Sequence, residues 1–138
     1  EVMPLQVEGQ FGIMLPSGLH LRYPELHQVE ENGRLEWRYY VRKKIERIHG
    51  PKCYQNTIQA LARCVMGEAM VRINKKYPAA LTIHDAVYCV VPEEEAEEAK
   101  RFIITELRVP PAWAKGCPLD AEGGYGRDLS FKMKKLEA

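Results

Sequence analysis

His84 and Asp85 are two polar residues that stand between apolar segments in the sequence LTIHDAVYCVVP, residues 81–92. Apolar, partly β-branched runs bounded by a proline predict two paired strands, with the polar pair at a tight hairpin turn. Two-residue turns prefer Asn-Gly, Asp-Gly or Gly-X because their backbone must reach positive φ, and His-Asp matches none of these. An aspartate at the tip of an apolar hairpin is costly to desolvate unless it binds a cation or stays in water. The pair is therefore a candidate cation site, and a solvated turn is the alternative.

Asp85 could take part in phosphoryl transfer only together with other acids. Catalysis through two metal ions requires at least two carboxylates that bridge ions roughly 3.5–4 Å apart, and this segment contains no other acid. A rival interpretation is a metal-dependent phosphohydrolase with a His-Asp pair, in which His20, His27 and His49 would be further ligands. Such enzymes carry the pair on a helix of an all-helical domain, whereas the β-branched residues around the pair favour strands here.

A second group of polar residues follows one face of a predicted helix. Gly50-Pro51 opens this helix, with proline in its favoured first turn, and the pattern continues to about Lys76. Four hydrogen-bonding side chains recur in it at intervals of four, three and four residues, namely Lys52, Asn56, Gln59 and Arg63. At about 3.6 residues per turn they share a face. Amides between cations suit the acceptors of the DNA minor groove, which can be contacted without regard to sequence. The alternative is an ordinary solvated face.

A basic run precedes this helix. From Arg34 to Lys52 there are seven Lys or Arg residues against two acids, Glu36 and Glu46, a local excess of five. The whole chain has a formal net charge of only +1, so any electrostatic attraction to nucleic acid must be local. Such a run could supply contacts to phosphates. The alternative is a solvated edge strand, since lysine on an edge prevents strands of different molecules from pairing.

The elements that must position these residues predict an α+β fold. Strands are expected on both sides of the LPSG sequence in residues 11–26, around an Asn-Gly turn at positions 32 and 33, and in residues 81–92. A second helix is expected after Pro92, with glutamates in its first turn, and residues 108–129 are loop-like with a possible last strand. An apolar stripe marks the core side of the first helix: Ile58, Leu61, Ala62, Val65, Ala69 and Ile73. We therefore expect a single domain over residues 1–138, an antiparallel sheet with helices packed on one face.

Composition narrows the class of protein. With 138 residues, of which 46% are hydrophobic, the chain can bury the core of one domain. Its four cysteines form no CxxC pair and three of them lie inside expected helices or strands, which favours buried thiols in a reducing compartment. The sequence has no apolar run long enough to span a bilayer and no signal peptide, so we expect a cytoplasmic protein without membrane contact. Because the sequence does not begin with Met, we expect it to be a segment of a longer protein.

Four linked segments resemble family A DNA polymerases, the Pol I type. LTIHDAVYCVVPEEEAEEA is similar to motif C, in which a strand, a His-Asp turn and a second strand are followed by Val-Pro and an acidic helix. HGPKCYQNTIQALARCVMGEAMVRI resembles the palm helix before motif C, with the phage-type pattern N-x-x-Q-A-x-A-R. LPSGLHLRYPEL and PPAWAKGCPLDAEGGYG are similar to strands and to the C-terminal segment of phage and prophage polymerases. The resemblance covers nearly the whole chain in the right order, and it implies a palm-like sheet from the end of the fingers to the C-terminus.

The resemblance also implies roles for individual residues. Asp85 would be one of the two catalytic, metal-binding palm aspartates, and His84 would approach the primer terminus. Gln59 and Asn56 would contact the nascent duplex on its minor-groove side. The resemblance supports the same contact for Arg63 less strongly. Ala86 stands where the family usually has Glu, so Asp85 is the only acid of the motif.

The implied activity is nucleotidyl transfer by a DNA-directed DNA polymerase, with primer-template DNA and deoxynucleoside triphosphates as partners. Two Mg²⁺ ions would act at a site completed by motif A, which carries the other aspartate, and by a fingers helix that holds the triphosphate. Both would lie N-terminal to Glu1, so we expect this chain to be inactive by itself. Its compartment would be the cytoplasm of a bacterial host if a phage or prophage encodes it. The alternative from another class is a non-catalytic nucleic-acid-binding remnant, or one half of a split polymerase.

Overall fold

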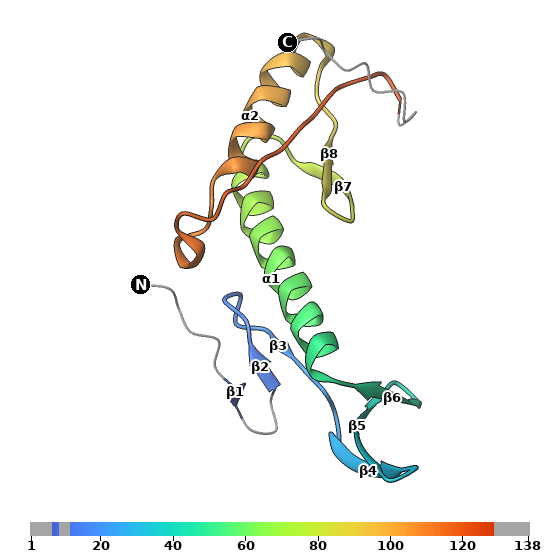
Figure 1. The fold of residues 1–138 in the computed structure, drawn as a ribbon. Coiled ribbons are helices and arrows are strands. Elements are labelled where there is room, and N and C mark those ends of the chain that lie inside the picture. The colour runs from blue at the N-terminus through green and yellow to red at the C-terminus, as the bar shows by residue number, and fades with distance from the viewer. Residues whose placement is uncertain (1–6, 9–11, 129–138) are drawn as a thin grey trace. The chain divides into compact units, whose positions relative to one another are not determined.

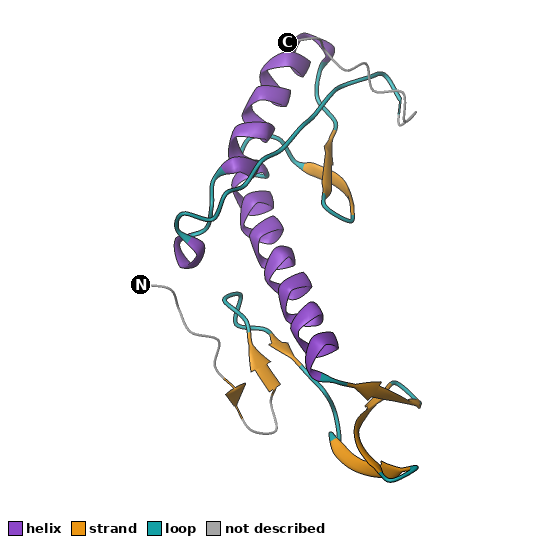
Figure 2. Ribbon diagram, in the orientation of Figure 1, coloured by secondary structure: helices purple, strands orange, loops and turns teal. Residues whose placement is uncertain are grey.

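The computed structural model describes Val7, Glu8 and residues 12–128. It divides the chain into two compact units, Glu1–Cys64 and Val65–Ala138. Figure 1 traces the elements in chain order, and Figure 2 distinguishes helices from strands. The boundary between the units falls inside the long helix α1 (Gly50–Ile73), so each unit contains part of that helix.

Two small antiparallel sheets precede α1 in the first unit. One sheet contains β1 (Val7–Glu8), β2 (Gly12–Met14) and β3 (His20–Leu21), and the other contains β4 (His27–Glu31), β5 (Arg34–Val41) and β6 (Lys44–Ile48). Each strand pairs with its neighbour in the sequence. The strands predicted on both sides of the LPSG sequence and around the Asn-Gly turn are confirmed.

Turn chemistry explains why these strands pair locally. Asn32 and Gly33 form the two-residue β4–β5 turn, and both have positive φ, 52° and 71°. Type I′ hairpin turns need positive φ at both central positions, which Asn-Gly accepts most readily. The β5–β6 turn also has two central residues, Arg42 and Lys43, and Arg42 adopts a φ of 57°. Short turns of this kind fix the register of β4, β5 and β6.

The apolar stripe predicted for α1 is correct toward the C-terminal end of the helix and wrong near its start. Ala69 and Ile73 are buried, whereas Ile58 is 47% exposed and Ala62 is exposed. Hydrophobicity alone therefore does not select the buried face of this helix.

Small polar residues occupy the buried side of α1 in the first unit. Thr57 and Cys64 are buried there. The Thr57 hydroxyl donates a hydrogen bond to the carbonyl oxygen of Cys53 at 2.9 Å, and the Cys64 thiol donates to the Ser17 hydroxyl at 3.5 Å. Because these side chains are short, the β2–β3 turn can approach the helix closely, and this packing decides which side of the helix is covered.

The second unit contains the end of α1, a β-hairpin and a shorter helix. β7 (Ala79–Ile83) pairs antiparallel with β8 (Ala86–Cys89), and α2 (Ala96–Arg108) follows a 3₁₀ turn at Glu93–Glu95. A second 3₁₀ turn lies at Ala112–Ala114. The predicted hairpin and second helix are confirmed.

Contacts between the end of α1 and α2 stabilise the second unit. The ring of Tyr77, which is buried, meets the ring of Phe102 edge-on with centroids 5.7 Å apart. Arg72 donates hydrogen bonds to the carboxylate of Glu106 at 2.8 Å and to the carbonyl oxygen of Val109 at 3.0 Å. The guanidinium of Arg72 therefore satisfies a carbonyl group beyond the last turn of α2.

The α+β class is confirmed, and all described strands pair antiparallel. The strands form three separate sheets, however, and not the single sheet with helices on one face that the sequence predicts. Pairing is confined to sequence neighbours joined by short turns, so no described strand links one sheet to another. The possible last strand is not formed in residues 109–128, and residue 129 lies outside the described residues. That residues 1–138 form one domain stays a prediction. None of the described helices has both the length and the apolar character needed to cross a membrane.

Ile73 offers a test of these burial assignments, because none of its surface is exposed. We expect Ile73→Ala to lower the free energy of unfolding by about 2–5 kcal/mol, since it removes buried methyl groups and leaves a cavity. Ile58→Ala, on an exposed part of the same helix, should cost less than about 1 kcal/mol. Urea unfolding followed by circular dichroism measures both values. Equal losses for the two variants would contradict the assignment of Ile58 to the surface.

Candidate functional site

The His84–Asp85 pair forms the two-residue turn of the β7–β8 hairpin. Ile83 and Ala86 are paired directly across it, so the two polar residues occupy the tip, as the sequence predicts. Both side chains are exposed. Within the described part of the chain, neither side chain has a hydrogen-bond or ion-pair partner. Asp85 therefore presents a free carboxylate to solvent.

The backbone of His84 is left-handed, with a φ of 53°. Residues other than glycine rarely adopt positive φ, although histidine does so more often than most. Such a conformation costs on the order of 1–3 kcal/mol. Glycine would adopt it without this strain. Arg42 adopts the same backbone at the first position of the β5–β6 turn, so this conformation belongs to the two-residue turn.

Among the described residues, metal ligands do not gather around Asp85. Across residues 7–8 and 12–128, no group of three or more His, Cys, Asp or Glu residues is placed to hold a metal ion. The phosphohydrolase alternative needs a helical His-Asp pair, and here the pair lies between two strands. His20, His27 and His49, the further ligands of that alternative, lie in the first unit. The strand setting of the His84–Asp85 pair disfavours that alternative.

The polar face of α1 from Lys52 to Arg63 lies in the first unit. Lys52, Gln59 and Arg63 are exposed, and neither cation has an ion-pair partner among the described residues. Asn56 is half-buried, and its side-chain nitrogen donates a hydrogen bond to the Tyr23 hydroxyl at 3.2 Å. Burial raises the pKa of Tyr23, and the hydrogen bond from Asn56 opposes that rise. Three of the four predicted side chains are thus exposed and available to contact a ligand. Asn56 uses one of its N–H groups for a hydrogen bond within the chain.

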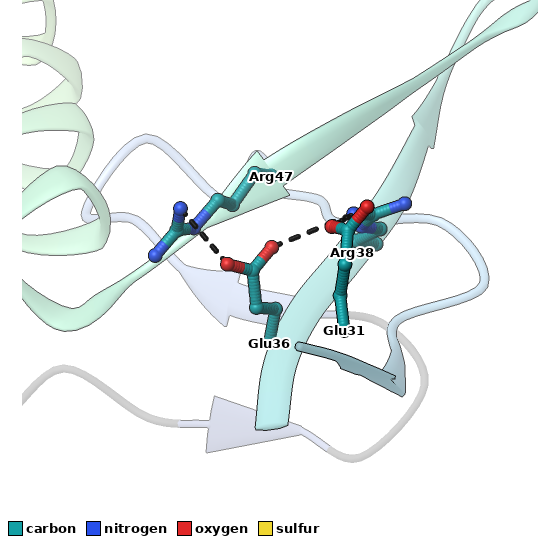
Figure 3. Close-up of polar contacts among 4 residues, drawn as sticks. All are labelled: Glu31, Glu36, Arg38 and Arg47. Atoms are coloured by element: carbon teal, nitrogen blue, oxygen red, sulfur yellow. Dashed lines mark hydrogen bonds and ion pairs between the residues drawn. The ribbon is translucent and has the colours of Figure 1, made fainter. Parts of the chain in front are cut away.

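Glutamates neutralise part of the basic run (Figure 3). Glu36 on β5 pairs with Arg47 at 2.9 Å and with Arg38 at 3.5 Å, and Arg38 also pairs with Glu31. The strand register places all four residues on one face of the β4–β6 sheet. Basic residues of the run without an ion-pair partner in the described chain are Arg34, Arg42, Lys43, Lys44 and Lys52. Three of these five cations lie at the β5–β6 turn, where the unpaired positive charge of the run is therefore concentrated.

The ion pairs of Arg38 could have been predicted from the sequence, whereas the hydrogen bond between Asn56 and Tyr23 could not. Glu36 and Arg38 are two residues apart on β5 and therefore share a face, and the Asn-Gly turn fixes the register that sets Glu31 on that face. The neutralisation of Arg38 could therefore have been predicted. The bond between Asn56 and Tyr23 joins residues far apart in the sequence, and no local pattern indicates it.

Fold and site together define an α+β chain with an exposed acidic hairpin turn and an exposed polar helix face. No protein-family model matches the chain, and no solved structure matches it. In sequence, the chain is 32% identical over 129 residues to a DNA polymerase of Bacillus phage SP02. The match covers 86% of this chain and 19% of that polymerase, so the chain spans about a fifth of its relative's length. Because only a seventh of this chain lies outside the match, the match spans α1 and the β7–β8 hairpin. The chain is therefore related to a phage DNA polymerase.

Proposed function

We propose that the chain is the C-terminal palm part of a family A DNA-directed DNA polymerase, to which it contributes one metal-binding aspartate and contacts to primer-template DNA. The observation that carries the proposal is the free carboxylate of Asp85 at a hairpin turn, in a chain that matches a phage DNA polymerase over 86% of its length. The order of elements supports it. A long helix, a strand, the His84–Asp85 turn, a second strand and an acidic helix follow one another, as in the motifs that the sequence resembles.

Asp85 suits a magnesium ligand by its chemistry. Mg²⁺ prefers oxygen ligands such as carboxylates and water, and the Asp85 carboxylate is exposed, without an ion-pair partner among the described residues. One carboxylate rarely holds Mg²⁺, so in this proposal a second aspartate and the substrate triphosphate complete the site. When bound, two such ions activate the primer 3′-hydroxyl and stabilise the leaving pyrophosphate. Asp85 would hold its share of these ions, and His84 would position the primer terminus beside them.

The polar face of α1 would contact the nascent duplex. The exposed amide of Gln59 can donate to purine N3 and pyrimidine O2, acceptors that recur at every base pair in the minor groove. Lys52 and Arg63 lie at the two ends of this face and would attract phosphates. Asn56 keeps one N–H and its amide oxygen for the duplex after its bond to Tyr23.

The β7–β8 hairpin has surface that the rest of such a polymerase would cover. Leu81 is 43% exposed and Ile83 is 41% exposed, and in the described part of the chain neither strand has a second neighbour. A two-stranded sheet is marginally stable in water without further packing. We therefore place the strand that carries the second aspartate beside this hairpin in the complete polymerase.

A hybrid polymerase, in which this chain replaces the matching segment of the phage SP02 polymerase, tests the proposal. We expect the hybrid to extend a primer on a template when all four deoxynucleoside triphosphates and Mg²⁺ are present. A hybrid that folds and binds primer-template but does not extend the primer would contradict the proposal.

Within this hybrid, Gln59→Ala should slow primer extension from a few-fold to about tenfold, the effect of losing one hydrogen bond. The loss should be similar for all four template bases, because minor-groove acceptors are nearly degenerate. Tyr54→Ala is the matched control, since Tyr54 is exposed on the opposite side of the same helix. Extension rates on four templates that differ at one base measure the effect. A loss confined to one template base, or an equal loss in the control, would remove Gln59 from the duplex contact.

A further inference from the structure

Trp37 lies near the centre of β5 and is 44% exposed. Beside it opens a pocket of about 190 Å³, lined chiefly by apolar atoms of residues that include Tyr23, Leu26, Ile48 and Cys53. All of these residues belong to the first unit. An exposed aromatic ring next to an apolar pocket is a surface on which another flat ring can stack.

The strand register places Trp37 on the same face of the sheet as a basic turn. Side chains alternate along a strand, so Trp37, Tyr39 and Val41 share one face of β5. Lys44 is paired with Val41 where β6 begins, and therefore belongs to that face. The distance along the strand from Trp37 to this turn is roughly 13 Å, four residues at about 3.3 Å each.

The unpaired positive charge of the sheet is concentrated at this turn. The arginines shown in Figure 3 lie on the opposite face, where glutamates neutralise them. Arg42, Lys43 and Lys44 are exposed, and none has an ion-pair partner in the described part of the chain. Two carboxylates, those of Glu30 and Glu46, share the face of Trp37, and the three cations of the turn still leave a net positive charge.

We propose that this face of the β4–β6 sheet binds single-stranded DNA, with a base stacked on Trp37 and the phosphates at the Arg42–Lys44 turn. Proteins that bind single strands combine aromatic rings, on which bases stack, with basic side chains that follow the backbone. That the strand is the unpaired template of a polymerase rests on the proposed function, whereas the binding surface itself does not.

Other partners would use only part of this surface. In a duplex the bases are stacked on one another and only their edges reach the grooves, so Trp37 would gain no stacking partner. An apolar protein segment could fill the pocket but would leave three exposed cations without counter-charges. A single strand supplies both aromatic faces and phosphates, and therefore matches the ring and the turn together.

Charge variants of the 138-residue chain test the role of the turn with a fluorescent oligothymidylate. The double variant Lys43→Gln/Lys44→Gln should make the slope of log affinity against log salt shallower by about 1.4, since each lost phosphate contact of a single strand removes about 0.7. The matched control Lys75→Gln/Lys115→Gln removes the same charge from exposed lysines of the second unit and should change the slope little. Glu46→Gln should tighten binding, because it removes the carboxylate of the Trp37 face that lies nearer the turn. Equal slopes in the two double variants would overturn the assignment to this turn.

Tryptophan fluorescence tests the stacking. The chain has two tryptophans, so Trp113→Phe leaves Trp37 as the single reporter. Oligothymidylate should quench this emission, and blunt duplex of the same length should not. Trp37→Leu should weaken binding at least about fivefold, and Trp37→Phe should retain most of the affinity. If Trp37→Leu fails to fold, quenching of the emission of the unaltered Trp37 tests the stacking by itself. Absence of quenching by oligothymidylate, or equal quenching by the duplex, overturns the proposal.

The hybrid polymerase separates this inference from the proposed function. If the hybrid extends primers and the chain fails to bind oligothymidylate through Trp37, only the single-strand surface is refuted. If the chain binds oligothymidylate as expected and the hybrid is inactive, only the polymerase assignment is refuted.

Discussion

Asp85→Asn in the hybrid polymerase should lower the rate of nucleotide incorporation by about a thousandfold or more, while affinity for primer-template stays near normal. Metal ions in two-metal sites stabilise the transition state by several kcal/mol, and each 1.4 kcal/mol corresponds to about a tenfold change in rate. The amide keeps the shape of the side chain and loses the negative charge that would bind the metal. In the proposed function, affinity for DNA depends instead on the polar face of α1 and on phosphate contacts, which this substitution leaves intact.

Glu94→Gln is the matched control for Asp85→Asn. Glu94 lies in the 3₁₀ turn between β8 and α2, is exposed, and has no ion-pair partner among the described residues. Its replacement removes the same charge from the same unit and should leave the incorporation rate within about twofold. Single-turnover kinetics with a titration of primer-template measures rate and affinity separately. Near-normal turnover in the Asp85 variant would remove Asp85 from the metal site.

The isolated 138-residue chain should show no primer extension, which is the second large effect that we expect. Two-metal phosphoryl transfer needs a shared site for both ions and a cationic grip on the triphosphate. Among the described residues no group of three or more acidic, histidine or cysteine side chains is placed to hold a metal ion, and Asp85 stands without a neighbouring acid in its motif. The chain should still bind DNA, with an affinity that falls steeply as the salt concentration rises.

The assay for this prediction incubates the purified chain with primer-template, all four deoxynucleoside triphosphates and either Mg²⁺ or Mn²⁺, beside an Asp85→Ala control. Extension that the control lacks would mean that a second metal-binding acid lies within this chain. Asp120, Glu122 and Asp128 would be the first candidates to replace. The carboxylate of Asp120 pairs with Arg108 at 2.8 Å, so this candidate would have to leave its ion pair to bind a metal.

Local chemistry made the hairpins predictable. Asn32 and Gly33 accept the positive φ of their turn, and alternating apolar runs identify the strands around His84 and Asp85. The polar face of α1 was also predictable, because helical spacing sets Lys52, Gln59 and Arg63 on one side whatever the helix packs against.

Tertiary packing decided what the sequence could not predict. Ile58 continues an apolar stripe and is nevertheless exposed, because the side of α1 that carries Thr57 and Cys64 is the one covered in the first unit. Asn56 has a bond to Tyr23 that depends on a contact distant in sequence. The described strands remain in three separate sheets because none of them pairs beyond its sequence neighbours, and no local pattern encodes whether such pairing occurs.

Cleavage by bound iron tests most directly whether the His84–Asp85 turn belongs to a polymerase metal site. Fe²⁺ in place of Mg²⁺, with ascorbate and peroxide, generates hydroxyl radicals that cut the polypeptide next to the ion. In the hybrid polymerase with primer-template and a non-extendable nucleotide, we expect a cut within a few residues of Asp85, retained in Glu94→Gln and lost in Asp85→Asn. Cuts elsewhere in the hybrid with none near this turn would contradict the assignment of Asp85 to the metal site.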